Sequence, residues 1–225
     1  MTVRTILFVH GAWANASAWS KVLPLVEAAG LDATAVQMPL TSLADDVGAV
    51  VRAIELADGP LLLVGHSYGG AVITEAGHHP KVGGLVYVAA FAPDEGESAG
   101  SLGAGGPATL LPNEVRPDAH GFLKLTRKGI DEAFAQDLPD AERAIVFATQ
   151  GPVSGGSLGG TISEPSWKQK PSWYLRASDD HAIHPELQQR MADRMGASTV
   201  TVASSHVPML SQPASVADLV IRAAR

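Results

Sequence analysis

Apolar residues come in short runs along this chain, each long enough for one strand. Six runs rich in β-branched residues predict strands at residues 3–9, 32–37, 60–65, 82–90, 172–177 and 198–203. Within several of them the apolar positions are nearly continuous. Because such a strand buries both of its faces, the runs predict the interior of a parallel sheet.

Between the runs, apolar residues recur with helical spacing. This spacing predicts helices at residues 18–29, 42–56, 68–78, 185–195 and 212–224. The second helix has Thr41 or Ser42 as its N-cap, and Asp45 and Asp46 lie in its first turn, where negative charge is favourable. The alternation predicts an α/β fold of about six parallel strands with helices on both faces.

Residues 92–170 interrupt this rhythm. They hold 12 of the 23 glycines, together with helical stretches at 130–138 and 141–149. An insertion directly after a strand of a parallel sheet lies near the carboxyl edge, where such folds bind ligands. We interpret the segment as an inserted cap; the alternative is a loose surface excursion.

Composition favours one globular enzyme domain over residues 1–225. The chain is 46% hydrophobic, enough for a full core, and no linker divides it. A net charge of -7 argues against nucleic acid or an anionic membrane as a partner, since both attract clustered Lys and Arg.

The absence of cysteine excludes disulfides and thiol catalysis. The sequence starts with a strand-like run instead of the basic and apolar segments of a secretory signal, and no apolar run reaches membrane-spanning length. We therefore expect the protein to be cytoplasmic.

One serine lies in a distinctive turn. Residues 65–69 read Gly-His-Ser-Tyr-Gly and connect an apolar run to a helical one. This pattern predicts a nucleophile elbow, in which glycines permit a tight turn and expose the Ser67 hydroxyl. The alternative is an ordinary glycine turn.

A serine nucleophile needs a base, and His206 follows the last predicted strand, as this architecture requires. His10 is expected to brace the loop after the first strand. The other histidines considered are expected to be structural: His66, His78, His79 and His120.

The acid that orients this base is expected after the preceding strand, where Asp179 and Asp180 both lie. The resulting order Ser, Asp, His is that of α/β hydrolases rather than of proteases. These two acids with His181 and His184 are alternatively a metal cluster, but one loop would supply only a partial site.

Stabilising an oxyanion requires two backbone N–H donors. One is predicted at Tyr68, directly after the nucleophile, and the other at Ala12, in the loop after the first strand. Gly11 has no side chain, so that loop can come close to the turn that carries Ser67. Trp13 either walls the substrate pocket or packs in the core.

Five segments together resemble the α/β-hydrolase family along nearly the whole chain. They are Phe-Val-His-Gly-Ala-Trp at 8–13, Ser-Ala-Trp-Ser-Lys-Val at 17–22, residues 38–46, residues 63–70 and Ala-Ala-Phe-Ala-Pro at 89–93. The resemblance is to a small bacterial esterase-like branch, similar to plant methyl-ester hydrolases and hydroxynitrile lyases. The chain lacks the first antiparallel strands of larger members, so the sheet size does not carry over.

The resemblance implies a Ser67-Asp180-His206 triad, an oxyanion hole at Ala12 and Tyr68, a mostly apolar pocket under the cap, and no cofactor. From the residues of the acid loop, no metal is expected either. Asp180 is favoured over Asp179 because it matches the family loop that leads to a helix-opening proline, here Pro185.

The expected activity is that of a serine carboxylesterase acting on a small to medium apolar ester. Trp13, Phe122 and Phe147 are the expected substrate-binding residues; further candidate liners are Leu102, Leu110, Leu111, Phe134 and Ile145. The alternatives are a cofactor-free lyase of the hydroxynitrile-lyase type and a ligand-binding protein with little turnover.

The lyases that look like this family carry a threonine in the hole loop and a lysine after the catalytic histidine. Gly11 and Val207 stand at those positions here, which favours ester hydrolysis.

Overall fold

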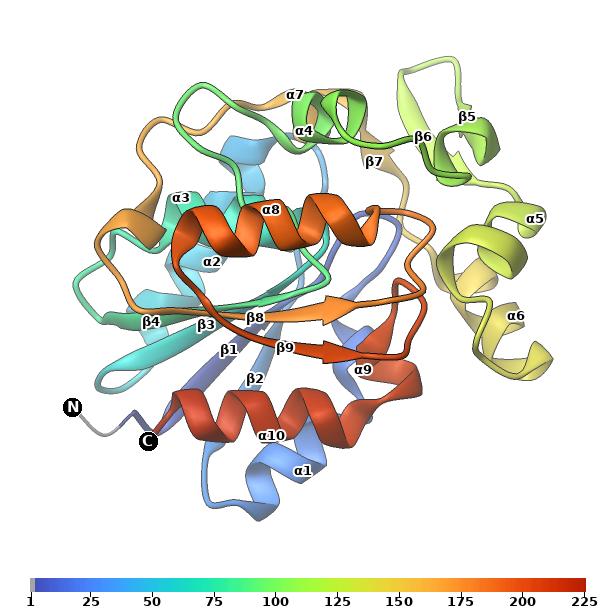
Figure 1. Cartoon of the computed structure of the whole chain (residues 1–225). Helices are drawn as coiled ribbons and strands as arrows, with labels where there is room; N and C mark the ends of the chain where they lie inside the picture. The colour runs from blue at the N-terminus through green and yellow to red at the C-terminus, as the bar shows by residue number, and fades with distance from the viewer. Residues whose placement is uncertain (1–2) are drawn as a thin grey trace.

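The apolar runs pair side by side in one parallel sheet in the computed structural model, which describes residues 3–225 (Figure 1). In spatial order the strands are β2 (Asp32–Val36), β1 (Thr5–Val9), β3 (Leu61–His66), β4 (Val82–Val88), β8 (Ser172–Ala177) and β9 (Ser198–Val202). All neighbouring pairs are parallel. The predicted α/β fold with six parallel strands is confirmed.

Helices cover both faces of this sheet (Figure 1). On one face lie α2 (Leu43–Leu56), α3 (Tyr68–Ala76) and α8 (Pro185–Met195); on the other, α1 (Leu23–Ala28) packs against α10 (Pro213–Ala223). A short helix, α9 (Pro208–Ser211), precedes α10. No helix within residues 3–225 has both the length and the apolar character needed to cross a membrane.

The helix expected at residues 18–29 is not continuous. The chain forms a 3-10 turn, η1 (Ala16–Trp19), and begins a new helix at Leu23. Pro24 explains the break: proline fits the first helical turn, but inside a longer helix it would remove a hydrogen bond and clash with the preceding turn.

Most of residues 92–170 form a layer of small elements beyond the carboxyl ends of β8 and β9 and above α8 (Figure 1), whereas residues 166–168 lie against α3. Along the chain these elements are α4 (Ala99–Gly105), η2 (Leu111–Glu114), β5 (Val115–Pro117), β6 (Phe122–Leu125), α5 (Arg127–Gly129), η3 (Ile130–Phe134), α6 (Asp140–Thr149), β7 (Val153–Ser154), α7 (Gly155–Gly159) and η4 (Ser166–Lys168). Strands β5, β6 and β7 pair as an antiparallel sheet that the sequence did not predict. The helix expected at 130–138 ends at Phe134 and has π-helical geometry.

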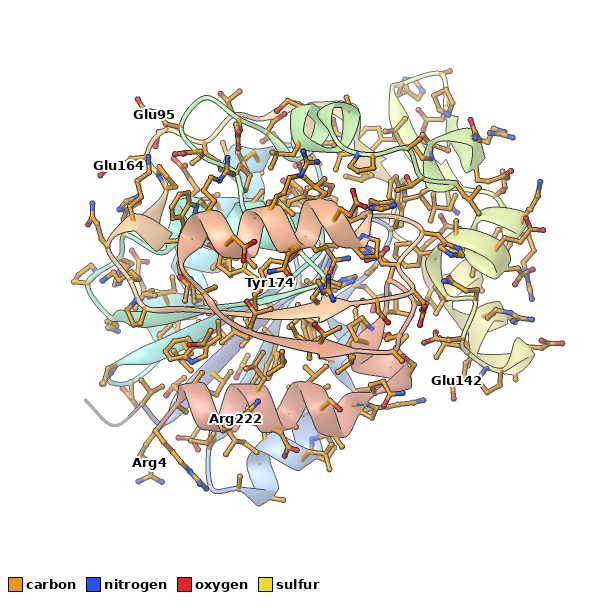
Figure 2. The ribbon with its side chains drawn as sticks, in the orientation of Figure 1. Arg4, Glu95, Glu142, Glu164, Tyr174 and Arg222 are labelled. Atoms are coloured by element: carbon orange, nitrogen blue, oxygen red, sulfur yellow. The ribbon has the colours of Figure 1, made fainter. Side chains whose placement is uncertain are left out.

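Tyr174 ties the end of β4 to its neighbour β8. It lies in the interior in Figure 2, whereas Arg4, Glu95, Glu164 and Arg222 lie at the periphery. Its hydroxyl donates to the carbonyl of Ala90 and accepts from the N–H of the same residue. The chain that leaves β4 toward the inserted segment is therefore held from inside the core.

Glycines let β3, α3 and the end of β1 meet at backbone distance. A Cβ at Gly65 would lie 2.6 Å from the carbonyl oxygen of Gly69, and one at Gly69 would lie 2.6 Å from that of His10. At Gly70 the distance to the carbonyl oxygen of Phe91 would be 2.2 Å. Because backbone atoms cannot rotate away, no side chain fits at these positions.

Gly69→Ala is expected to lower the free energy of unfolding by about 2 kcal/mol or more, because its Cβ would push α3 away from β1. Gly48→Ala in α2 is the matched control. Its Cβ would meet only the tip of Arg52, at 3.5 Å, and it should raise stability by up to about 1 kcal/mol. Urea unfolding of both variants measures the difference; equal stabilities would contradict this account of the elbow.

Candidate active site

Three loops at the carboxyl edge of the sheet bring Ser67, His206 and Asp180 together. Ser67 lies between β3 and α3 with φ 53° and ψ -123°, while Asp180 follows β8 and His206 follows β9. The Nε2 atom of His206 is 2.8 Å from the Ser67 Oγ, and its Nδ1 is 2.7 Å from the Asp180 Oδ2. All three residues are buried.

The hydrogen bonds determine where the protons lie. A carboxylate only accepts, so the Nδ1–H of His206 donates to Asp180 and its Nε2 is left to accept the Ser67 hydroxyl. The other Asp180 oxygen accepts the N–H groups of Ala182 and Ile183, at 2.7 and 2.9 Å. These donors offset the cost of burying the charge.

Gln188 is a further partner of Asp180 that sequence reasoning missed. Its Nε2 donates to the Asp180 Oδ2 at 2.8 Å and to the Ile183 carbonyl, while its Oε1 accepts the Ala177 N–H. Gln188 therefore joins the end of β8 to the acid loop. The sequence offered one signal for this role: Gln188 is a polar residue on the buried face of α8, next to Leu187.

The adjacent acid is placed differently. Asp179 is exposed, and its carbonyl accepts the Nε2–H of Gln136 from the inserted segment. Nearby, His184 accepts the Glu186 N–H at the start of α8. Of the two candidate acids, only Asp180 reaches His206.

The two residues predicted to supply oxyanion donors belong to the cavity that contains Ser67. Ala12 and Tyr68 line it, and within residues 3–225 neither backbone N–H is bonded to another part of the chain. A Cβ at Gly11 would lie 2.7 Å from the Cβ of Ser67. A side chain at Gly11 would therefore collide with Ser67, so the loop after β1 approaches Ser67 closely only because residue 11 is glycine.

Buried Asp46 holds the side chain of Tyr68. Its carboxylate accepts the Tyr68 hydroxyl and the Leu40 N–H, both at 2.7 Å. Burial raises the pKa of Asp46. The sequence suggested only a favourable charge in the first turn of α2, but Asp46 also fixes the side chain of Tyr68, the residue after Ser67.

Two buried histidines brace the site. His10 donates through Nδ1 to the Gly11 carbonyl at 2.9 Å and accepts the Met38 N–H at Nε2 at 3.0 Å, the bracing contacts that the sequence predicts. Burial lowers the pKa of His10 to about 4. His66 donates from Nε2 to the His206 carbonyl at 2.7 Å; burial, and then the charge of His206, hold its pKa well below 6.5.

The cavity around Ser67 has a volume of about 330 Å³ and is mostly apolar. Trp13 lines it, as do residues of the inserted segment, among them Ala99, Leu111 and Leu158. Phe134 packs against the ring of His206, with centroids 5.0 Å apart.

Two predicted substrate-binding residues are wrong, because neither Phe122 nor Phe147 lines this cavity. Phe122 belongs to β6, in the small antiparallel sheet. Phe147 is 37% exposed on α6. Ile145, Val146 and Thr149 of the same helix line a different cavity, and Phe147 lines neither.

The chain is similar to known hydrolases and to a lyase along most of its length. The model of the "Alpha/beta hydrolase family" matches residues 6–219. The chain is 28% identical to a pyrethroid hydrolase of Sphingobium wenxiniae, over 98% of this chain and 87% of the relative. It is 25% identical to Methylesterase 8 of Arabidopsis thaliana (97% and 88% covered) and 27% identical to Alpha-hydroxynitrile lyase of the same plant (94% and 93%). A crystal structure of the pyrethroid hydrolase PytH superposes with a TM-score of 0.86 at 25% identity, covering 99% of this chain and 98% of that one.

His10 should make the fold sensitive to acid. Its pKa is about 4 in the folded chain and 6.5 when unfolded, so below pH 6.5 the unfolded state takes up a proton that the folded state refuses. Stability is fully present above pH 6.5, and about 3 kcal/mol is lost between pH 6.5 and 4. His10→Gln keeps an acceptor for Met38 and should remove that part of the slope in urea unfolding, whereas exposed His120→Gln should not. Parallel slopes for all three proteins would contradict the role of His10.

Proposed function

The chain belongs to the alpha/beta hydrolase family, and on that basis we propose that it is a serine carboxylesterase-type hydrolase that forms an acyl-enzyme on Ser67. The observation that supports this most is the unbroken chain of hydrogen bonds from Ser67 through His206 to Asp180, 2.8 and 2.7 Å long. A serine hydroxyl is a weak nucleophile unless a base in contact with it takes its proton.

In the proposed reaction, the Ser67 Oγ attacks the ester carbonyl carbon while the Nε2 of His206 takes the hydroxyl proton. Asp180 holds the imidazole and stabilises its charged form. The negative charge that develops on the carbonyl oxygen is bound by the N–H groups of Ala12 and Tyr68. His206 then gives its proton to the leaving alcohol, and water, activated by the same histidine, releases the acid from Ser67. These steps need no cofactor.

The size and lining of the cavity support a small to medium apolar ester. About 330 Å³ is at the lower end of the volumes typical of small-molecule sites. The lining residues from the inserted segment, such as Ala99, Leu111 and Leu158, are apolar. We propose that this segment, residues 92–170, acts as a cap on a single domain.

Cyanohydrin cleavage is the rival reaction, since Alpha-hydroxynitrile lyase is among the relatives. Gly11 favours hydrolysis, because any side chain there would collide with Ser67 beside the oxyanion donors. Val207, next to His206, supplies no cation to attract a cyanide anion.

Ser67→Ala should fold normally and lose about 10⁶ in kcat, in line with the removal of other catalytic serines. The test is intact-protein mass spectrometry after treatment with an organophosphonate ester, together with hydrolysis of simple esters. One adduct is expected on the native chain and none on Ser67→Ala. Labelling that survives the substitution would refute the assignment of Ser67, and faster cyanide release from mandelonitrile than hydrolysis of any ester would favour the lyase.

Asp180→Asn should lower kcat by about 10⁴, because an amide facing Nδ1 lets the imidazole take the wrong tautomer. Asp179→Asn is the matched control: its exposed side chain does not reach His206, so its effect should be small. Ester hydrolysis by both variants, with folding checked by circular dichroism, makes the comparison. If Asp179→Asn were the inactive variant, the acid would be off by one residue; if neither lost activity, the triad would be wrong.

A further inference from the structure

A second cavity, also of about 330 Å³, lies behind the wall of the one that contains Ser67. Ala18, Val146 and Met209 give it an apolar lining. At its rim, the Lys21 Nζ and the Glu142 Oε2 form a partly exposed ion pair of 2.7 Å. Glu142 lies at the outer edge of the molecule in Figure 2, so this rim faces solvent.

The wall between the cavities is one side chain thick. Trp13 lines both of them. Phe134 lines the second cavity, and its ring lies 6.4 Å from that of Trp13, edge to face, and 5.0 Å from that of His206. The chain itself crosses the wall, because His206 lines the first cavity and Val207 the second.

The indole of Trp13 is held in this position from both ends. Its backbone has φ 57°, which a non-glycine residue rarely adopts, and its Nε1–H donates to the Leu123 carbonyl of β6 at 3.0 Å. Because Trp13 lines both cavities, a shorter side chain at this position would join them.

The chemistry of ester cleavage indicates which half of the substrate, the alcohol or the acid, would lie against Trp13 and Phe134. His206 must protonate the leaving oxygen, so the alcohol portion lies on the His206 side of the scissile bond. Phe134 and Val207, the neighbours of His206, line the second cavity. A bulky alcohol would therefore meet Trp13 and Phe134, whereas the acyl portion would extend toward Ala99 and Leu158.

We propose that Trp13 determines specificity by closing off the second cavity, an alcohol-side subsite, and so restricts the enzyme to esters of small alcohols. The proposal rests on the esterase function proposed above and adds which half of the ester is limited, and by which residue.

Two ester series test this proposal. One combines butyrate with methyl, benzyl and biphenylmethyl alcohols; the other combines methanol with butyric, phenylacetic and biphenylacetic acids. In Trp13→Ala the ratio of kcat/KM for the biphenylmethyl ester to that for methyl butyrate should rise about tenfold or more, a gain typical of relieving a steric limit. Trp13→Phe is a more conservative change that keeps the test valid if Trp13→Ala does not fold, and it should give a smaller rise in the same ratio. The acid series should change little.

A large side chain that fills the second cavity tests whether the gain comes from access to that cavity or from a general loss of order in the site. Val146→Trp, added to Trp13→Ala, should remove the gain for the biphenylmethyl ester, because residue 146 lines that cavity. Ala148→Trp is the matched control on the same helix, since Ala148 is exposed and lines neither cavity. Folding is compared by thermal unfolding.

The outcomes separate the two proposals. If the native chain hydrolyses no ester and Ser67 is not labelled, the esterase function fails. If it hydrolyses methyl esters, the proposal for Trp13 is overturned by an unchanged alcohol series in both Trp13 variants, by a gain confined to the acid series, or by a gain that survives Val146→Trp.

Discussion

Ser67 has φ 53° and ψ -123° because β3 turns into α3 with no loop between them. That backbone conformation costs on the order of 1–3 kcal/mol, and it persists only where the surroundings allow no alternative. Within residues 3–225, three other non-glycine residues have positive φ: Trp13, Leu40 and Ala89. They follow β1, β2 and β4, so the strained residues gather at the same edge of the sheet as Ser67. Strands β3 and β4, buried almost throughout, supply the packing that holds them there.

Buried polar groups then fix each member of the site from behind. Gln188 holds Asp180, Asp46 holds Tyr68, His66 holds the backbone of His206, and His10 holds the loop that carries Ala12. Desolvation keeps both bracing histidines neutral near pH 7, so they contribute hydrogen bonds without placing further positive charge beside His206. Donors fixed in this way need not reorganise when charge develops during a reaction, which is the physical basis of electrostatic catalysis.

The features predicted from sequence are those encoded locally. Continuous apolar runs identified six strands, and the glycines around Ser67 identified the turn. The order of Ser67, Asp180 and His206 along the chain put them on loops that share one edge of the sheet, and the family resemblance is confirmed. Where local signals were weak, prediction failed. Strands β5 and β7 have only three and two residues, too few to show a period. Phe122 was assigned to the pocket from its apolar character alone, although the direction of a cap side chain depends on contacts distant in sequence.

The inserted segment is hydrogen-bonded to the two loops that carry Asp180 and His206. The Asp137 carboxylate accepts the N–H of Ser205 at 2.9 Å, next to His206, and the Gln136 amide donates to the Asp179 carbonyl at 2.6 Å, next to Asp180. Phe134, from the same stretch, packs on the imidazole itself. Because these contacts bear on the base and the acid and not only on the cavity wall, the segment cannot shift without disturbing the spacing of His206 and Asp180. The shape of the cavity and the spacing of these residues are therefore coupled, and we expect substitutions in residues 130–138 to change kcat as well as KM.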